Sequence, residues 1–377
     1  MANGTAMNEQ SRSTRRYVLI TPCRDEADTA RRTLDSVTHQ SVPPALWVIV
    51  DDGSTDNTTV ILQEYARRFD YIRVVRREDR GERSVGPGVI DAFYAGLETV
   101  DLNAFEYLCK LDLDLDLPPR YFEILMERME MNPRIGTCSG KAYYPAPGNF
   151  DRSSDGELVS EACGDEMSVG MTKFYRVSCF KQIGGFVRAV MWDGIDCHRC
   201  RMLGWIACSW DEPELRFVHL RPMGTSYKGV FTGRMRHGYG QYYMGTGLLY
   251  MSASALYRMT RPPLLAGGSA MWWGYVKAML QRAPRHQDAD LRRFIRRYQY
   301  ACLLRGKRAA TAAIEDEFAS RWRDDDNGQR SADTANVNNE GGDEEGGRDN
   351  DGRDHDRKDS GGKDSGARAK AMREADQ

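Results

Sequence analysis

Aspartates end one of the apolar runs of this sequence in a spacing suited to binding a cation. The segment LDLDLD at 111–116 carries Asp112, Asp114 and Asp116 at alternate positions. Alternate side chains of an extended segment point to the same side, so three negative charges would lie together and repel one another. A divalent cation removes this repulsion, because Mg²⁺ takes one or two carboxylate oxygens together with substrate phosphates. The segment therefore predicts a metal–diphosphate site.

A second acidic segment, VDDGSTD at 50–56, follows the apolar run LWVIV. Taken alone, Asp51 to Asp56 are typical of an ordinary Asp-Gly turn with a helix cap. The segment also stands where a sheet would present ligand-binding groups. Both interpretations stay open on these residues alone.

The elements around these segments alternate between strand and helix. YVLIT (17–21), LWVIVDD (46–52), YIRVV (71–75) and FEYLCKLDLDL (105–115) are apolar runs typical of buried strands, and apolar residues at helical spacing follow the first two. Such alternation predicts an α/β fold with a mainly parallel, twisted sheet covered by helices on both faces. Ligands bind such sheets beyond the carboxyl ends of the strands, which is where both acidic segments lie.

Charge is distributed unevenly over the 377 residues, although 53 Lys and Arg nearly balance 55 Asp and Glu. Residues 323–377 contain 10 basic and 16 acidic residues and no aromatic residue, which leaves residues 1–322 with a net charge of +4. That tail has too little apolar surface to offset its chain entropy, so we expect it to be disordered. No global field favours nucleic acid as a partner.

The nine cysteines form no regular framework, and the polar N-terminus lacks the apolar core of a secretory signal. Both features predict a cytoplasmic protein in a reducing compartment.

Three motifs in order, TPCRDE (21–26), VDDGSTD (50–56) and LDLDLDLPP (111–119), resemble family 2 glycosyltransferases over roughly residues 17–220. The resemblance implies a GT-A (Rossmann-like) fold that binds a nucleotide-diphosphate sugar. It implies that Asp112 and Asp114 hold a divalent cation, Mg²⁺ or Mn²⁺, with Asp116 as an additional carboxylate. It also implies donor contacts from Pro22, Arg24, Glu26, Asp51 and Asp52, and a Gly-rich loop at 81–88 where Arg83, together with Lys110, could offset diphosphate charge.

The segment MWDGID (191–196) resembles the family motif in which an aspartate eleven residues before a glycine, here Gly204, is the catalytic base. This spacing selects Asp193, with Asp196 as a nearby competitor, and Asp193 can also cap the following helix. His219 falls where some family members place a histidine that completes the metal shell. A structural hydrogen-bonding role for His219 is the alternative.

The resemblance implies an inverting transfer of the hexosyltransferase type. The Gln-x-x-Arg-Trp motif of processive synthases is absent from the sequence, which favours a single-sugar transferase with a sugar, polysaccharide or lipid-linked acceptor in cell-envelope or exopolysaccharide assembly. Two alternatives remain open: a non-catalytic nucleotide-sugar or lipid-associated binding protein, and a cation-dependent nucleotidyltransferase.

The residues after His219 are expected to serve the acceptor side. Arg234, Arg236 and His237 are candidate anion contacts of a Gly-rich loop that closes over the diphosphate or the acceptor, and a packed turn region is the alternative. Residues 247–280 hold two apolar stretches, and residues 281–308 follow with nine Arg or Lys against two acids. Together they predict contact with an anionic membrane surface, the alternative being a core helix pair and a solvated basic helix.

The expected organisation therefore has four parts: a disordered N-terminus (1–16), a GT-A catalytic domain (17–260), an apolar and basic helical extension (261–322) and a disordered acidic tail (323–377).

Overall fold

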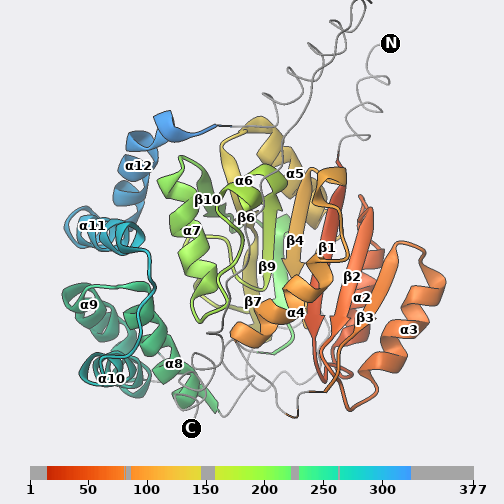
Figure 1. Ribbon diagram of the computed structural model, residues 1–377, viewed down its shortest axis with the longest axis horizontal. Helices are drawn as coiled ribbons and strands as arrows, with labels where there is room; N and C mark the ends of the chain where they lie inside the picture. The colour runs from red at the N-terminus through yellow and green to blue at the C-terminus, as the bar shows by residue number, and fades with distance from the viewer. Residues whose placement is uncertain are drawn as a thin grey trace, which may run out of the picture. The chain divides into compact units, whose positions relative to one another are not determined.

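The computed structural model describes residues 15–79, 81, 86–145, 158–221, 229–261 and 264–323 (Figure 1). All of these residues belong to the first of two units, Met1–Gly328. Residues 1–14 and 324–377, for which disorder is predicted, lie outside the described residues. The first described residues contact the domain: Glu130 accepts a 2.7 Å hydrogen bond from Arg15 Nε, and Glu106 accepts one of 3.0 Å from the Arg16 backbone N–H.

A mainly parallel sheet forms the centre of the described chain. Its seven described strands run in the order β10-β6-β9-β4-β1-β2-β3. Their bounds are β1 Tyr17–Cys23, β2 Leu46–Asp51, β3 Ile72–Arg76, β4 Tyr107–Leu111, β6 Ile135–Ser139, β9 Thr172–Arg176 and β10 Ile206–Ser209. β9 runs antiparallel to both of its neighbours, β4 and β6, and the other pairs are parallel.

Helices cover both faces of this sheet, as the continuous apolar runs of its strands require. On β1, Tyr17 and Leu19 are buried in one hydrophobic cluster, whereas Val18 and Ile20 are buried in another. The first cluster includes residues of α2 (Ala30–Thr38), α3 (Thr58–Arg68) and α5 (Tyr121–Met131), and the second includes residues of α4 (Pro87–Leu97), α6 (Val177–Gln182) and α7 (Trp192–Met202). The predicted fold class is thereby confirmed.

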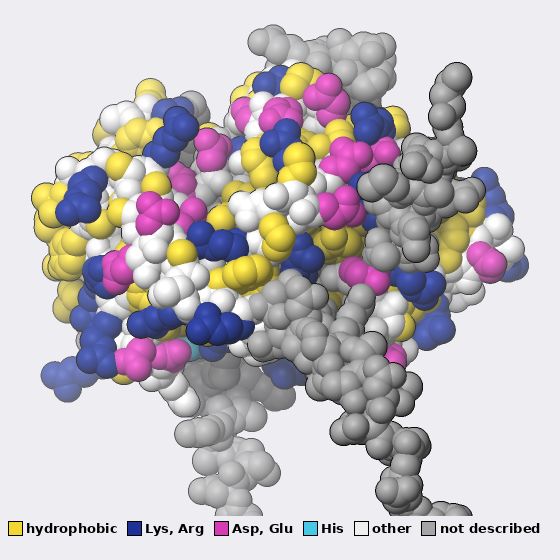
Figure 2. Space-filling model, turned by 90° about the horizontal axis from the view of Figure 1, so that it is seen from above, with side chains coloured by type: hydrophobic (Ala, Val, Ile, Leu, Met, Phe, Trp, Pro, Cys, Tyr) yellow, Lys and Arg dark blue, Asp and Glu magenta, His cyan; other side chains and the backbone are white. Residues whose placement is uncertain are grey.

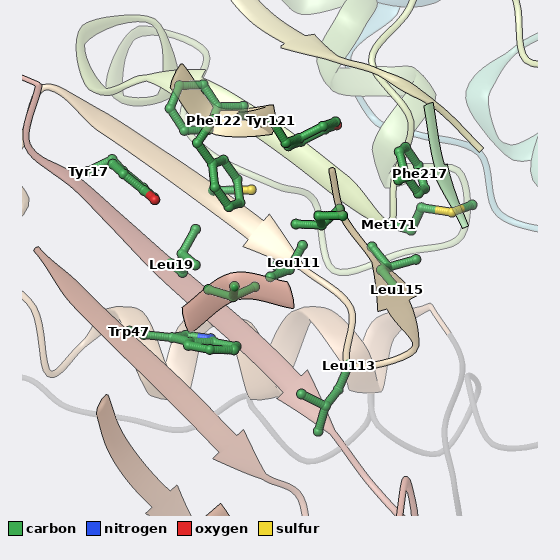
Figure 3. Packing of buried hydrophobic residues seen from close by; sticks show 14 of the residues in the cluster. Tyr17, Leu19, Trp47, Leu111, Leu113, Leu115, Tyr121, Phe122, Met171 and Phe217 are labelled. Atoms are coloured by element: carbon green, nitrogen blue, oxygen red, sulfur yellow. The ribbon is translucent and has the colours of Figure 1, made fainter. Parts of the chain in front are cut away.

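Aromatic side chains fill much of the first cluster (Figure 3). The ring of Phe122 lies 5.0 Å from that of Tyr17 and 5.3 Å from that of Tyr121. The contact with Tyr17 packs the start of α5 against β1, so the segment just after LDLDLD is anchored to the centre of the sheet.

The next strand after β4 belongs to a second, smaller sheet. Its described strands have the order β5-β11-β7-β8, with bounds β5 Leu115–Asp116, β7 Lys141–Pro145, β8 Leu158–Ser160 and β11 Arg216–His219. The segment predicted to be one strand over 105–115 is therefore divided between two sheets. The division occurs because the Asp112 N–H donates to the Met171 carbonyl (2.8 Å), while the Asp114 carbonyl accepts from the Leu220 N–H (2.9 Å).

Short 3-10 turns, η1 (Leu102–Ala104), η2 (Pro213–Leu215) and η3 (Ala319–Arg321), connect or end elements. The C-terminal part is helical: α8 Gly229–Met244, α9 Leu248–Met259, α10 Ala266–Leu280, α11 Ala289–Arg305 and α12 Lys307–Glu317. α8, α9 and α10 share a hydrophobic cluster across the domain boundary expected at residue 260, and α11 and α12 share another with α7.

Glycines allow α8 and α10 to approach closely. A Cβ added to Gly274 would lie 2.1 Å from the Met235 carbonyl oxygen, and one added to Gly238 would lie 1.9 Å from that of Met271. Both distances are far below van der Waals contact with backbone atoms, so neither position has room for a side chain.

We expect Gly274→Ala to lower the free energy of unfolding by about 1–3 kcal/mol, because the added methyl forces α8 and α10 apart. Urea unfolding followed by far-UV circular dichroism measures the change. Ser269→Ala, at an exposed position of the same helix, is the matched control and should be near neutral. Equal stability of the two variants would contradict the close approach.

Candidate functional site

The two acidic segments meet at the carboxyl edge of the central sheet. β1 and β2 are parallel with Cys23 opposite Asp51, and the Asp52 N–H donates to the Cys23 carbonyl at 2.9 Å. β4 runs parallel to β1 on its other side. The residues that follow these three strands therefore lie along one edge, as the sequence predicted.

Asp51 has a structural role in its turn. Its side chain is fully buried and accepts hydrogen bonds from the Ser54 N–H (2.8 Å) and the Thr59 hydroxyl (2.5 Å). Asp56 accepts from the Thr58 N–H at the start of α3 (2.9 Å). The turn-and-cap interpretation of Asp51 and Asp56 thus describes their contacts in this structure.

Asp52 and Arg24 form a charged cluster beside that turn. Arg77 Nη1 lies 2.8 Å from Asp52 Oδ1, and Arg24 Nη1 donates to the Asp52 carbonyl at 2.9 Å. Arg24 Nη2 also donates to Asp79 at 2.7 Å. Pro22 is buried within β1 opposite Val50. Arg83 lies outside the described residues.

Asp114 contacts two basic side chains at the end of β11, His219 in its last position and Arg221 two residues later. Arg221 donates to Asp114 Oδ2 from Nη2 (2.8 Å) and Nε (3.1 Å), and its Nη2 lies 2.5 Å from Glu26. His219 Nε2 lies 3.5 Å from the same Asp114 oxygen, and its Nδ1 lies 3.1 Å from Glu161. Although burial opposes the shift, hydrogen bonds with His219 and Arg221 hold the pKa of Asp114 below its usual range.

The same contacts set the protonation of His219. Burial acts to lower its pKa, but hydrogen bonds to Asp114 and Glu161 prevail and raise the pKa of His219 to about 10. In this form His219 is a cation that bridges two carboxylates. Arg221 and Glu161 were not identified from the sequence. The i, i+2 spacing of Arg221 from His219 could have indicated Arg221, whereas no local signal indicates Glu161.

The three aspartates of the LDLDLD segment have three different basic partners. The chain leaves the strand conformation after Leu111, and Asp116 in β5 pairs with Arg32 of α2 at 2.7 Å. Asp112 pairs with Lys110 instead. Each carboxylate of the LDLDLD segment therefore has its own basic partner.

The donor chemistry of Asp112 and Asp114 fits a divalent cation. Asp114 Oδ1 is buried and has no hydrogen-bond partner, so a hard oxygen ligand is available there. No group of three or more His, Cys, Asp or Glu side chains is arranged around a metal position among the described residues. A cation bound here would be held by Asp112 and Asp114 and would compete with the Arg221 and His219 contacts.

Asp193 lies in the first turn of α7 and is half-buried. Across the described part of the chain, its carboxylate accepts no hydrogen bond, so its oxygens are available to a substrate. Its backbone carbonyl accepts from Lys173 Nζ at 2.6 Å. A Cβ added to Gly170 would lie 3.0 Å from Asp193 Oδ2, so the glycine allows the carboxylate to lie against the backbone before β9.

Asp196, the competitor for the base, is 1% exposed. It pairs with Lys173 and accepts from the Tyr175 hydroxyl, and the Cys197 N–H donates to it at 2.6 Å. Both of its oxygens are occupied by buried partners, so Asp196 is a structural residue in this arrangement.

Two buried lysines connect the LDLDLD segment to α7. Lys110 and Lys173 are opposite each other on the antiparallel strands β4 and β9 and are 2% and 0% exposed. Like charges directly opposite are destabilising, yet each lysine has its own carboxylate, Asp112 or Asp196. Their ammonium groups lie 5.3 and 5.6 Å from the ring centre of Trp192. Lys110 is thus a partner of Asp112, and Lys173 was missed because nothing in its sequence surroundings indicates a role.

The candidate anion contacts lie on α8, so they belong to a helix and not to the Gly-rich loop or turn region that the sequence predicted. His237 lies near Arg234 and Arg258, and burial, followed by these two charges, lowers its pKa to about 3. Gly240 of α8 packs against Met191, the residue before α7. α8 therefore passes beside the turn that presents Asp193, although within the described chain Arg234 and His237 contact none of Asp112, Asp114 and Asp193. Arg236 lies on the same helix.

The model of glycosyl transferase family 2 matches residues 18–189. The chain is 29% identical to the poly-beta-1,6-N-acetyl-D-glucosamine synthase of Staphylococcus epidermidis over 119 residues, which is 31% of this chain and 26% of the synthase. It is 25% identical to the uncharacterized glycosyltransferase YibD of Escherichia coli strain K12 over 114 residues, 30% of each protein. The chain thus matches less than a third of the length of these curated relatives.

Solved structures similar to the chain have low identity. TarS 1-349 of S. aureus in complex with UDP is 13% identical, with a TM-score of 0.44 over 80% of this chain and 83% of that one. A mannosyltransferase from Pyrobaculum calidifontis in complex with GDP-Man and Mn²⁺ is 17% identical, with a TM-score of 0.43 over 81% and 85% of the two chains.

We expect Lys173→Met to lower the free energy of unfolding by about 3–5 kcal/mol, because it leaves the Asp196 charge buried without its counter-ion. Denaturant unfolding measures the loss. The double variant Lys173→Met/Asp196→Leu removes both charges and should recover most of the stability. A single variant as stable as the parent chain would show that the pair does not organise this region.

Proposed function

Since residues 18–189 form a glycosyl transferase family 2 domain, we propose that this chain is a hexosyltransferase-type enzyme that moves a sugar from a nucleotide-diphosphate sugar to an acceptor hydroxyl with inversion. The acceptor is a polysaccharide or lipid-linked sugar in cell-envelope or exopolysaccharide assembly. The similarity to a polysaccharide synthase over 119 residues supports this acceptor class.

One observation carries the proposal: Gly170 and Met171 bring the LDLDLD segment and Asp193 to the same stretch of backbone. The Asp112 N–H donates to the Met171 carbonyl (2.8 Å), and Lys110, the partner of Asp112, donates to the Gly170 carbonyl (3.0 Å). The position of a Cβ on Gly170 is 3.0 Å from Asp193 Oδ2. A carboxylate with available oxygens therefore lies beside the residues suited to a diphosphate-bound cation.

In the proposed reaction Asp193 takes the proton of the acceptor hydroxyl. The acceptor oxygen then forms its bond to the anomeric carbon while the bond from that carbon to the diphosphate oxygen breaks, and the nucleoside diphosphate leaves with the electron pair. A hydroxyl is a weak nucleophile until a positioned carboxylate accepts its proton. The Lys173 contact to the Asp193 carbonyl and the close packing on Gly170 hold this carboxylate in place.

Asp112 and Asp114 would hold a divalent cation, Mg²⁺ or Mn²⁺, whose chemistry when bound is to neutralise the charge of the leaving diphosphate. Arg221 and His219, the basic partners of Asp114 in this structure, would supply positive charge beside that cation and the diphosphate. We propose donor contacts from Arg24 and Asp52, which belong to the charged cluster at this sheet edge, and from Glu26, which pairs with Arg221. Arg234, Arg236 and His237 are proposed to serve the diphosphate or acceptor side from α8.

The available carboxylate of Asp193 favours a transferase over a binding protein, because binding a donor requires no base. A nucleotidyltransferase would join a nucleotide to a sugar phosphate, whereas the proposed enzyme releases nucleoside diphosphate. A screen of nucleotide sugars with Mg²⁺ or Mn²⁺ separates these functions. Release of nucleoside diphosphate supports transfer, donor binding without turnover indicates a binding protein, and pyrophosphate release indicates a nucleotidyltransferase.

We further propose that the enzyme works in the cytoplasm, at the inner face of the membrane. All nine cysteines lie in the described part of the chain and each is a free thiol, which supports a reducing compartment. None of the described helices combines the length and hydropathy needed to cross a bilayer.

Asp114→Asn should reduce sugar transfer by about 10³-fold, because an amide binds a hard cation far more weakly than a carboxylate does. Steady-state release of nucleoside diphosphate across a Mn²⁺ titration measures the loss. Asp116→Asn is the matched control from the same segment, since its partner is Arg32, and it should retain transfer. Near-normal turnover by a folded Asp114→Asn variant would refute the metal role.

Asp193→Asn should lose transfer by about 10²–10⁴-fold, because the amide cannot accept the hydroxyl proton. Donor affinity should stay within about twofold of the parent chain, since Asp193 lies apart from the charged cluster of Arg24 and Asp52. Isothermal titration with the donor measures the affinity separately from turnover. Transfer at the parent rate would show that another residue is the catalytic base.

A further inference from the structure

Large apolar side chains are exposed mainly on the C-terminal helices. Thirteen of the fifteen exposed large hydrophobic residues in the described chain lie between residues 231 and 304. Those on α9, α10 and their connection, which we call the α9–α10 face, are Leu248, Leu249, Leu256, Tyr257, Leu264, Leu265, Trp272, Trp273 and Leu280. In Figure 2 hydrophobic side chains gather along the left edge, the side on which α8 to α12 lie in Figure 1, with Lys and Arg side chains among and below them.

On α10 the exposed residues of the α9–α10 face recur at helical spacing. Trp273, Lys277 and Leu280 are exposed at i, i+4 and i+7, so they lie on one side of the helix. The opposite side, which includes Met271 and Tyr275, is buried against α8 and α9. α10 is therefore apolar on both sides, but only one of them packs against other described parts of the chain.

Trp272 joins the two helices of the face. Its indole N–H donates to the Ser252 hydroxyl of α9 at 3.3 Å, and its side chain is still 39% exposed. Trp273 beside it is 49% exposed. Indole rings with one apolar and one polar side favour the boundary between headgroups and acyl chains.

The apolar stripe of α11 packs against the protein. Leu291, Phe294, Ile295 and Tyr298 recur at helical spacing and are buried in a cluster with α7 and α12. The apolar side of this basic helix is thus occupied by the protein itself. Of the thirteen exposed large apolar side chains on the C-terminal helices, nine belong to the α9–α10 face.

Charge decides which occupant fits the face. Residues 229–305 contain 12 Arg and Lys but only two acids, Asp288 and Asp290. Arg261 and Lys277 are exposed at the face, and Arg282 is exposed two residues after α10. A second copy of the chain would bring two basic surfaces together, which like-charge repulsion disfavours, whereas an anionic lipid surface attracts them.

We propose that the α9–α10 face inserts shallowly into an anionic lipid monolayer, with Trp272, Trp273 and Leu265 at the acyl boundary and Arg261 and Lys277 at the headgroups. The biological purpose of this contact rests on the proposed function: an enzyme seated on the membrane would meet a lipid-linked acceptor at the membrane surface. The contact itself requires neither donor nor turnover.

Binding is tested by sedimentation of the full chain with vesicles, without donor or metal. The expected result is at least tenfold tighter binding to phosphatidylcholine vesicles with 30% phosphatidylglycerol than to phosphatidylcholine alone. Trp272→Ser/Trp273→Ser/Leu265→Ser should lose at least tenfold in affinity for the anionic vesicles. Arg261→Gln/Lys277→Gln should weaken binding and flatten its dependence on ionic strength.

Val60→Ser/Met131→Ser is the matched control, since both side chains are exposed and apolar but lie on α3 and α5. It should bind as the parent chain does. Quenching of tryptophan fluorescence by lipids brominated in the acyl chain reports insertion of the parent chain without any substitution.

Four outcomes would overturn the proposal: no binding of the parent chain to either vesicle, no quenching by brominated lipid, unchanged binding by the tryptophan variant, or a parent dimer in analytical ultracentrifugation that the tryptophan variant converts to monomer. The last outcome would make the face an interface between two copies. Donor turnover with a soluble acceptor is measured on the same samples, so loss of vesicle binding with retained turnover is distinguished from failure of the proposed function.

Discussion

The cross-strand pair of buried lysines is the interaction on which the site depends. Lys110 and Lys173 face each other on β4 and β9, where two uncompensated ammonium groups would be very costly. Their burial requires a carboxylate for each, and the two carboxylates come from different elements: Asp112 from the end of β4 and Asp196 from α7. Charge balance inside the protein therefore fixes α7 against the acidic end of the sheet. Asp193, three residues before Asp196, is carried to that end by the same constraint.

This arrangement separates residues that hold the site from residues that are available to act. Asp51, Asp56 and Asp196 have their oxygens occupied by the protein. In contrast, the carboxylate of Asp193 accepts no hydrogen bond from the described residues, and one oxygen of Asp114 has no hydrogen-bond partner among them. A transferase needs both a base and a ligand for a cation near a diphosphate. Asp193 lies against Gly170, and the next residue, Met171, accepts from the N–H of Asp112 in the segment that carries Asp114. The proposed function follows from this division, and the family 2 match over residues 18–189 supplies the class of reaction.

Sequence patterns predicted the fold well because a strand of a parallel sheet that is buried on both faces needs a continuous run of apolar residues, which is visible in the sequence. The runs at 17–21, 46–52 and 71–75 are strands, and the acidic segments follow them at one edge. The pattern gives a wrong prediction where one apolar run contributes to two sheets. LDLDLD alternates throughout and predicts one strand, yet β4 ends at Leu111 and β5 belongs to the second sheet. The stripe of α11 was likewise visible, but periodicity cannot tell a stripe that packs on protein from one that faces lipid.

By itself the sequence determined the order of elements, the edge at which chemistry is placed and the uneven distribution of charge along the chain. Tertiary structure alone decided which charges meet. Asp114 pairs with Arg221 across 107 residues, Asp116 with Arg32 across 84, and Asp196 with Lys173 across 23. The physical reason is that a strand or helix is encoded by neighbours along the chain, whereas the protonation and availability of a carboxylate depend on burial and on the nearest cation. Those are properties of position in space, and no local spacing records them.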